Sequence, residues 1–352
     1  MPNKPNDTNV LNWLLAAASV VVIIAGVRVA HTLVVPFLMA AFLAVICTPA
    51  LQWLQRKGVP TALALLLVIG GMSSVVVFVG LVASASIQDF LVKMPEYAKQ
   101  LEQRVGDLGP WIMDTLDRFG IQWSPEKLKE ILPTEKIVKH FASFLSGLTG
   151  VFGNVFLVLL TFLFMLLEAS GFPRKLLALS GGRPLLSRQA ERIRDSINQY
   201  MTLKTVLSLL TGVLVAALVK LLGVDYPVLW GLLAFFFNFV PNIGSIIAAV
   251  PAILLALIQT DLTTTLLTAA GYVIINVCIG NLLEPRIMGR GLGLSTLVVF
   301  VSLVFWGWVL GPVGMLLSVP LTMIVKITLE NFEQTRWIAV LLSANPDVEA
   351  GG

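Results

Sequence analysis

Charged residues are scarce in this chain, and their scarcity excludes an ordinary water-soluble fold. Only 12% of the 352 residues are Asp, Glu, Lys or Arg, about half the share of a soluble domain. Hydrophobic residues make up 57%, and the mean hydropathy is +0.89. The net charge of +4 is small, and no basic cluster of the kind that binds nucleic acid lies outside the loops between apolar segments. We therefore expect a membrane protein, whose apolar surface is covered by lipid.

Cysteine and histidine are also rare, which argues against metal and redox chemistry. Cys47 and Cys278 each lie in an apolar stretch and are predicted to be small buried thiols. Neither has the neighbours that a metal site requires. His31 and His140 lie at the edges of predicted membrane spans, where interfacial histidines are expected. The sequence therefore predicts no metal site and no cofactor.

Catalytic motifs are missing as well. The chain has no Gly-x-Ser-x-Gly, no His-Glu-x-x-His and no Walker A sequence. The run Gly289-Arg290-Gly291-Leu292-Gly293 superficially resembles a nucleotide-binding loop, but it follows no strand pattern and opens no βαβ unit. We therefore do not expect an enzyme.

Long uncharged runs dominate the rest of the sequence. About 20 apolar residues are needed to cross the hydrocarbon core of a bilayer. The runs cover residues 8–27, 29–55, 58–88, 140–167, 205–219, 226–260, 262–283 and 291–325. The shortest, 205–219, is flanked by Lys204 and Lys220, whose ammonium groups we expect to snorkel outward. The pattern predicts an all-α membrane bundle of about eight transmembrane helices.

A polar insertion and several basic loops set the predicted domains and orientation. Residues 1–88 hold the first three spans, 89–139 a small extramembrane helical insertion divided at Gly106, Gly109 and Pro110, 140–330 the later spans, and 331–352 a tail. Basic residues gather between the second and third spans and in the loop 169–204. Because positive loops stay in the cytoplasm, we expect a cytoplasmic N-terminus and a periplasmic insertion.

The run 226–260 is longer than one span needs and is interrupted by helix-breaking residues. Asn238, Pro241, Asn242 and Gly244 lie together near its middle. Proline removes a backbone donor and bends a helix, and the freed backbone groups must then meet protein or water. We expect a broken or re-entrant helix here. One crossing, two crossings and a re-entrant hairpin all remain open at this point.

Polar residues predicted at membrane depth gather late in the chain and suggest a substrate path. The candidates are Asn238, Pro241, Asn242, Gly244, Asn276, Asn281, Glu284, Arg286 and Arg290. Broken helices are common transporter substrate sites, and polar groups in lipid are costly unless they pair or line a wet cavity. Two structural alternatives stay open: the asparagines join helices by hydrogen bonds, and the three charged residues lie in a solvated loop.

Small residues near the C-terminus indicate close helix packing. Gly307 and Gly311 form a Gly-x-x-x-Gly pair, and Gly314 follows. Such glycines let two helix backbones approach. The motif does not distinguish packing within one chain from packing between copies.

Several ordered motifs in the last third resemble those of a known family. They are Val240-Pro241-Asn242-Ile243-Gly244-Ser245, Asn281-Leu282-Leu283-Glu284-Pro285-Arg286-Ile287-Met288-Gly289, Gly293-Leu294-Ser295, Phe305-Trp306-Gly307-Trp308, Gly311-Pro312-Val313-Gly314-Met315 and Val319-Pro320-Leu321. On these motifs the chain resembles the autoinducer-2 exporter family of bacterial inner-membrane proteins, and most of all its transporters of that quorum-sensing signal. The resemblance implies about eight spans and a homo-oligomer, for which a pentamer is one arrangement. It assigns no binding residue.

Three functions fit the sequence. The first is export of a small, uncharged, polar signal such as autoinducer-2, which the asparagines suit. The second is sodium or other cation–proton antiport, which needs a membrane-embedded carboxylate. Glu284 is its best candidate, ahead of Glu168 and Asp261 at span ends. The third is a scaffold or regulatory membrane protein that docks partners through the insertion, whose balanced charges indicate no particular partner.

Overall fold

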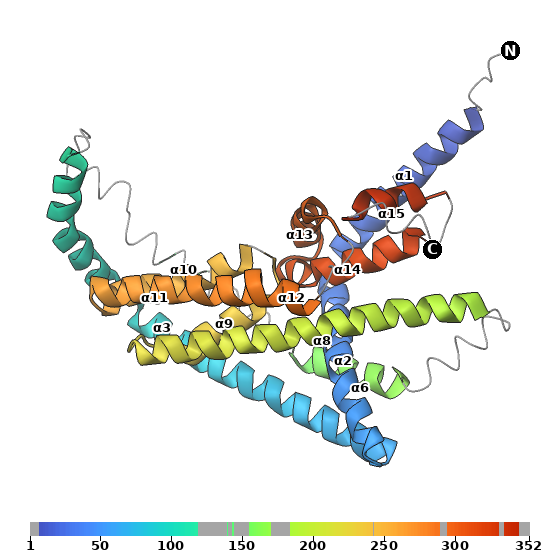
Figure 1. The fold of residues 1–352 in the computed structure, drawn as a ribbon, viewed down its shortest axis with the longest axis horizontal. Helices are drawn as coiled ribbons and strands as arrows, with labels where there is room; N and C mark the ends of the chain where they lie inside the picture. The colour runs from blue at the N-terminus through green and yellow to red at the C-terminus, as the bar shows by residue number, and fades with distance from the viewer. Residues whose placement is uncertain are drawn as a thin grey trace. The chain divides into compact units, whose positions relative to one another are not determined.

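The computed structural model describes residues 7–118, 139, 143, 155–169, 184–241, 243–288, 294–330 and 334–344, and all regular elements in those residues are helical. The chain divides into two compact units, one formed by Met1–Val45, Leu157–Ile197 and Gly293–Gly352, the other by Ile46–Phe156 and Asn198–Leu292. The helices in chain order are α1 (Asp7–Val29), α2 (His31–Arg56), α3 (Thr61–Arg118), α6 (Val155–Ala169), α8 (Pro184–Leu221), α9 (Pro227–Phe237), α10 (Ile243–Gln259), α11 (Leu262–Asn276), the π-helix η1 (Val277–Leu283), α12 (Glu284–Met288), α13 (Thr296–Leu310), α14 (Pro312–Glu330) and α15 (Arg336–Leu342) (Figure 1).

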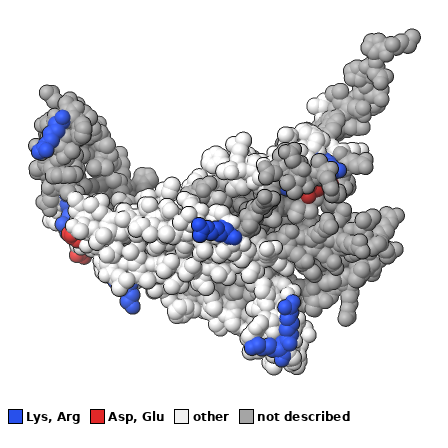
Figure 2. Space-filling model, viewed as in Figure 1, with Lys and Arg blue, Asp and Glu red and all other residues white. Residues whose placement is uncertain are grey.

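The length and apolar surface of these helices suit a bilayer. Among the described residues, five stretches are long and apolar enough to cross a membrane: His31–Arg56, Thr61–Arg104, Ile197–Leu221, Leu262–Ile287 and Pro312–Glu330. Large apolar side chains such as Leu66, Phe78 and Leu81 of α3 are exposed. Figure 2 shows a face on which uncharged residues dominate and charged groups occur at a few separate places. The predicted helical membrane fold is confirmed, and the number of about eight crossings stays a prediction.

Helix α3 extends far beyond its apolar part. It runs unbroken from Thr61 to Arg118, so the prediction that Gly106, Gly109 and Pro110 divide the insertion is wrong. Good helix formers such as Glu, Gln, Lys and Arg fill the turns before these positions. Each glycine costs only about 1 kcal/mol, and a proline can kink a helix without ending it. The sequence Ser124-Pro125-Glu126, which favours a helix start, lies outside the described residues.

The predicted break in residues 226–260 is confirmed. Helix α9 ends at Phe237, the backbone turns at residues 238–241, and α10 begins at Ile243. The eleven residues of α9 extend about 16 Å, about half the thickness of a hydrocarbon core. At the far ends, the backbone N–H of Asp225 donates to Gln259 Oε1 at 3.0 Å. The segment is therefore a helical hairpin whose two ends lie close together.

Glycines allow the helices of the second unit, which includes Asn198–Leu292, to approach closely. A Cβ on Gly244 would collide with the carbonyl oxygen of Phe237 across the hairpin. Between α8 and α9, a Cβ on Gly212 would lie 2.7 Å from Gly231 O, and one on Gly231 would lie 2.6 Å from Gly212 O. The α8 and α9 backbones therefore touch at these two glycines, and any side chain there would separate them.

The apolar core of this unit surrounds Trp230 of α9. Trp230 is fully buried and packs in one cluster with Phe90 of α3, Val215 of α8 and Leu255 of α10. Its indole Nε1 donates to the carbonyl oxygen of Asp225 at 2.7 Å, so its polar group is satisfied. Burying an aromatic side chain of this size stabilises a fold by about 3 kcal/mol or more. This core fixes the hairpin against α3 and α8.

A second tight hairpin, formed by α13 and α14, lies in the other unit. Gly311 makes its turn with φ +70°, a conformation that glycine adopts without strain. A Cβ on Gly314 would collide with the carbonyl oxygen of Trp306, and one on Gly307 would approach the Met315 side chain. These contacts lie within one chain. Trp306 Nε1 also donates to Thr322 Oγ1 at 3.0 Å, which joins the two helices.

Candidate functional site

Helix α8 carries a polar stripe that is buried inside the second unit. Tyr200, Lys204, Ser208 and Thr211 follow one another at intervals of four, four and three residues, which places them on one helix face. All four side chains are buried. Thr211 satisfies its own hydroxyl by donating to the carbonyl oxygen of Leu207 at 2.9 Å. The stripe gives an apolar helix a continuous polar side, with Lys204 and Ser208 free to contact other elements.

Lys204 pairs with Glu284 at the start of α12. The distance from Lys204 Nζ to Glu284 Oε1 is 2.6 Å, and only 4% and 22% of the two side chains is exposed. A charge at membrane depth is costly unless it meets an opposite charge. The pair therefore presents a nearly neutral, strongly dipolar group between α8 and α12.

A π-helix immediately precedes Glu284. Residues Val277–Leu283 form η1, and the backbone N–H of Glu284 donates to Ile279 O, five residues back. Pro285 follows and has no N–H to donate. The wider π turn changes the register of the helix and so sets the direction in which Glu284 leaves the backbone. Such π segments are frequent at functional sites.

Asn238 contacts the same stripe of α8 from the hairpin. It caps the C-terminus of α9, and its side-chain Nδ2 donates to Ser208 Oγ at 2.9 Å. Ser208 is fully buried, whereas Asn238 is partly accessible. The broken helix therefore places an uncharged amide and a hydroxyl together, one helical turn along α8 from the ion pair.

The other predicted path residues are spread over several elements and do not form one cluster. Pro241 lies in the hairpin turn, Gly244 is buried at the start of α10, and Asn276 is half-buried at the end of α11. Asn281 and Arg286 are exposed, and Arg286 lies outside the Lys204–Glu284 pair. The predictions for Asn242 and Arg290 fall outside the described residues.

The sequence does not predict Lys204 and Ser208 as site residues. The sequence predicted that the Lys204 ammonium group snorkels outward, and this is wrong, because only 3% of the residue is exposed. The carboxylate of Glu284 gives it an inward partner 80 positions away in the chain. The one available signal was a lysine at the edge of an unusually short apolar run.

A second polar cluster joins α3 to the ends of the hairpin. Tyr226 donates to Asp89 Oδ2 at 2.6 Å, its hydroxyl lies 3.3 Å from that of Tyr97, and Gln259 Nε2 donates to Asp225 Oδ2 at 2.6 Å. Gln259 Nε2 also lies 3.2 Å from the Tyr97 hydroxyl. The Tyr226 phenol is the donor to Asp89.

The backbone of Tyr226 supports the importance of this cluster. Its φ is +59°, a left-handed conformation that is strained for a bulky residue. Strain of this kind persists only where surrounding contacts hold it. The edge contact with the Phe90 ring and the hydrogen bonds above supply them. No local sequence pattern points to this cluster, because its members come from three separate segments: α3, the two residues before α9 and the end of α10.

The histidine, cysteine and carboxylate groups of the described residues do not form a metal site. No cluster of three His, Cys, Asp or Glu side chains occurs there. His31 is exposed, with Nδ1 3.0 Å from Arg28 O, and His140 lies outside the described residues. Cys47 is buried as predicted, but Cys278 is exposed. The prediction for Cys278 is wrong because an apolar run can turn one side of its helix to lipid, where a thiol is also tolerated.

Asp261 and Glu168 are the two other carboxylates that the sequence offered for cation–proton antiport. Asp261 is the N-cap of α11 and accepts hydrogen bonds from the backbone N–H and the hydroxyl of Thr264. The hydrogen bond from the Thr264 hydroxyl holds the pKa of Asp261 below its usual value. Glu168 is exposed near the end of α6. The hydrogen-bond partner of the Asp261 carboxylate is therefore Thr264, and not a residue of the polar stripe of α8.

Comparison with known proteins gives the family. The model of the AI-2E family transporter matches residues 17–334. The AI-2 transport protein TqsA of Escherichia coli K12 is 42% identical over 342 residues, which cover 97% of this chain and 98% of TqsA. A Haemophilus influenzae protein named as a transport protein is 41% identical over 351 residues, covering 98% of this chain and 99% of its own. YhhT of Escherichia coli K12, also named as a transport protein, is 37% identical over 339 residues, covering 96% of each chain. With matches of this length, and a helical membrane fold that carries a buried polar stripe, the chain belongs to the AI-2E transporter family.

Proposed function

We propose that this transporter exports autoinducer-2, a small, uncharged, polar signal, across the bacterial inner membrane. Membership of the AI-2E family supports the transporter class. The name of TqsA, an AI-2 transport protein that is 42% identical along almost its whole length, supports the substrate. The outward direction rests on the resemblance to exporters.

The contact between Asn238 and Ser208 is the observation that carries this proposal. An amide and a hydroxyl meet at a helix break deep in an apolar unit, 2.9 Å apart. A hydroxylated solute can replace either partner, because its own hydroxyls donate and accept equally well. The ion pair one turn away adds a dipole without a net charge. Such a lining favours a neutral polar solute over an ion.

Cation–proton antiport is less well supported. That activity needs a carboxylate that binds a cation and a proton in turn. The Lys204 ammonium group already occupies Glu284 at 2.6 Å, and a metal cation would have to displace it. Asp261 is used as a helix cap. No observation favours the scaffold hypothesis, which relied on the insertion.

The remaining parts of the proposal concern topology and assembly. The basic loops support a cytoplasmic N-terminus and a periplasmic position for residues 89–139. The resemblance to the family supports a homo-oligomer, with a pentamer as one arrangement. Cysteine labelling from each side of the membrane tests the topology, and mass measurement in detergent tests the assembly.

Asn238→Leu, combined with Ser208→Ala, will lower the flux of labelled autoinducer-2 in proteoliposomes about tenfold. Leucine keeps the size of the asparagine but cannot hydrogen-bond, and a lost polar contact in a dry site is worth about 1.4 kcal/mol. The second substitution removes the serine hydroxyl that would otherwise be left buried without its partner. Initial rates, normalised to the amount of incorporated protein, give the result.

Gln52→Leu is the matched control, because Gln52 is an exposed amide residue of α2 that is not among the predicted path residues. We expect its flux to equal that of the unaltered protein. If flux falls equally in the two variants, Asn238 does not line the path. If the unaltered protein passes no autoinducer-2, the substrate proposal fails.

A further inference from the structure

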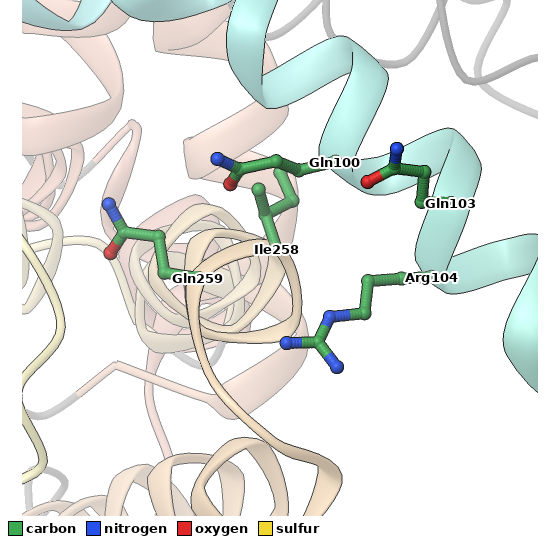
Figure 3. A pocket seen from close by; sticks show the side chains of 5 residues that line it. All are labelled: Gln100, Gln103, Arg104, Ile258 and Gln259. Carbon is green, nitrogen blue, oxygen red and sulfur yellow. The ribbon is translucent and has the colours of Figure 1, made fainter.

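An open polar cavity lies at the end of the hairpin, away from the stripe of α8. Its volume is about 300 Å³, and its lining consists of Gln100, Gln103, Arg104, Ile258 and Gln259. Figure 3 shows the first three on α3 and the last two at the end of α10. The volume lies at the lower end of the range for ligand pockets. Only a small solute fits.

Two of the amide side chains that line the cavity are held by hydrogen bonds. The Gln259 amide donates to Asp225 and lies within hydrogen-bond distance of Tyr97, while its oxygen accepts from the Asp225 backbone. These contacts hold it in one orientation. Gln100 is tied to Glu96 by a hydrogen bond of 3.2 Å from Nε2 to Oε1. Two of the three amides are therefore held in place before any solute binds.

The α3 side of the cavity carries a positive charge. Arg104 is half-buried, and no carboxylate among the described residues lies within ion-pair distance of its guanidinium group. In Figure 3 this group extends from α3 into the open space between the two helices. A guanidinium group presents five donors that match the geometry of a carboxylate or phosphate. The lining has a formal charge of +1 and more donors than acceptors.

The geometry points to a binding site for a small anionic hydroxy-solute, such as a phosphorylated polyol or a hydroxy acid. Its phosphate or carboxylate pairs with Arg104, and its hydroxyls contact the amides of Gln100 and Gln103. The site is distinct from the proposed autoinducer-2 path. Asn238 lies at the tip of the hairpin and Gln259 at its open end, separated by the full length of α9.

Calorimetry on the purified full-length chain, in a phosphate-free detergent, tests this site. The probes are glycerol 3-phosphate, glycerol and inorganic phosphate, so that the hydroxyl and phosphate contributions are measured separately. We expect saturable binding of glycerol 3-phosphate, and weaker binding of the other two. Arg104→Gln should weaken it about tenfold, the usual effect of losing one charge-assisted contact.

Lys99→Gln is the matched control, since it removes the same charge from an exposed position on α3 outside the cavity. It should leave the dissociation constant unchanged. Gln103→Leu, at an exposed side chain, provides a second variant that does not depend on the folding of Arg104→Gln, and should weaken binding about threefold.

Three calorimetric results would overturn the proposal: no saturable binding, equal losses in Arg104→Gln and Lys99→Gln, or equal affinity for inorganic phosphate alone. Native mass spectrometry separates a free solute from a lipid headgroup. A phospholipid that co-purifies with the unaltered chain and is lost in Arg104→Gln would assign the site to a lipid headgroup. It would overturn the proposal that the site binds a free solute. None of these measurements uses autoinducer-2 flux, so they fail or succeed independently of the proposed function.

Discussion

Glu284→Gln will leave a large share of the protein unfolded or aggregated after extraction in detergent. The substitution removes the carboxylate that lies 2.6 Å from Lys204, whose side chain is 4% exposed. A buried charge that loses its partner costs about 3–5 kcal/mol, a large part of the stability of a typical fold. Fluorescence-detected size exclusion after a temperature series measures the loss.

Removing both charges should reverse most of this effect. The double variant Lys204→Leu with Glu284→Leu leaves no unpaired charge, and apolar replacements of a buried pair are often neutral or stabilising. Lys93→Gln is the control, because Lys93 and Asp89 form an exposed pair at 2.9 Å, and exposed pairs contribute little. If Glu284→Gln is as stable as Lys93→Gln, the Lys204–Glu284 pair does not hold α8 to α12.

The parts of the fold that could be predicted from the sequence are those that local composition determines. Uncharged runs predict helices in lipid because length and hydropathy suffice. The break between α9 and α10 was predictable because Pro241 and its neighbours disfavour a continuous helix over residues 238–244. Gly106, Gly109 and Pro110 misled the prediction, since the same breaker residues interrupt a helix in one place and are tolerated in another.

The site was only partly predictable because its contacts join distant segments. Asn238 and Glu284 stood out as polar residues in apolar surroundings, but their partners Ser208 and Lys204 lie 30 and 80 positions away. Apart from the shortness of the run 205–219, nothing local distinguishes a lysine that snorkels from one that turns inward. The π-helical hydrogen bonding of η1 could not be predicted from the sequence either, since it depends on how the helix packs.

These contacts make α8 the element on which the site of the second unit is built. Gly212 sets the distance to α9, Ser208 meets the hairpin tip, and Lys204 meets α12. A shift of the hairpin along α8 would therefore change the hydrogen bonding of Asn238 while Gly212 keeps the helices close. Transport along the proposed path would require a hairpin that stays tightly packed while Asn238 exchanges one hydrogen-bond partner.

Gly244→Ala tests that packing and should cause the largest loss of folded protein from adding a single methyl group. The new Cβ would collide with the carbonyl oxygen of Phe237, and a backbone atom cannot rotate away as a side chain can. We expect a loss of about 3 kcal/mol, the upper part of the range for overpacking, measured as thermal stability in detergent. Gly70→Ala in α3 is the matched control, because its added methyl meets nothing within 4 Å, and alanine favours a helix by about 0.5–1 kcal/mol. Equal stability of the two variants would show that the hairpin is not closed at Gly244, and the hairpin geometry on which the proposed path depends would be lost with it.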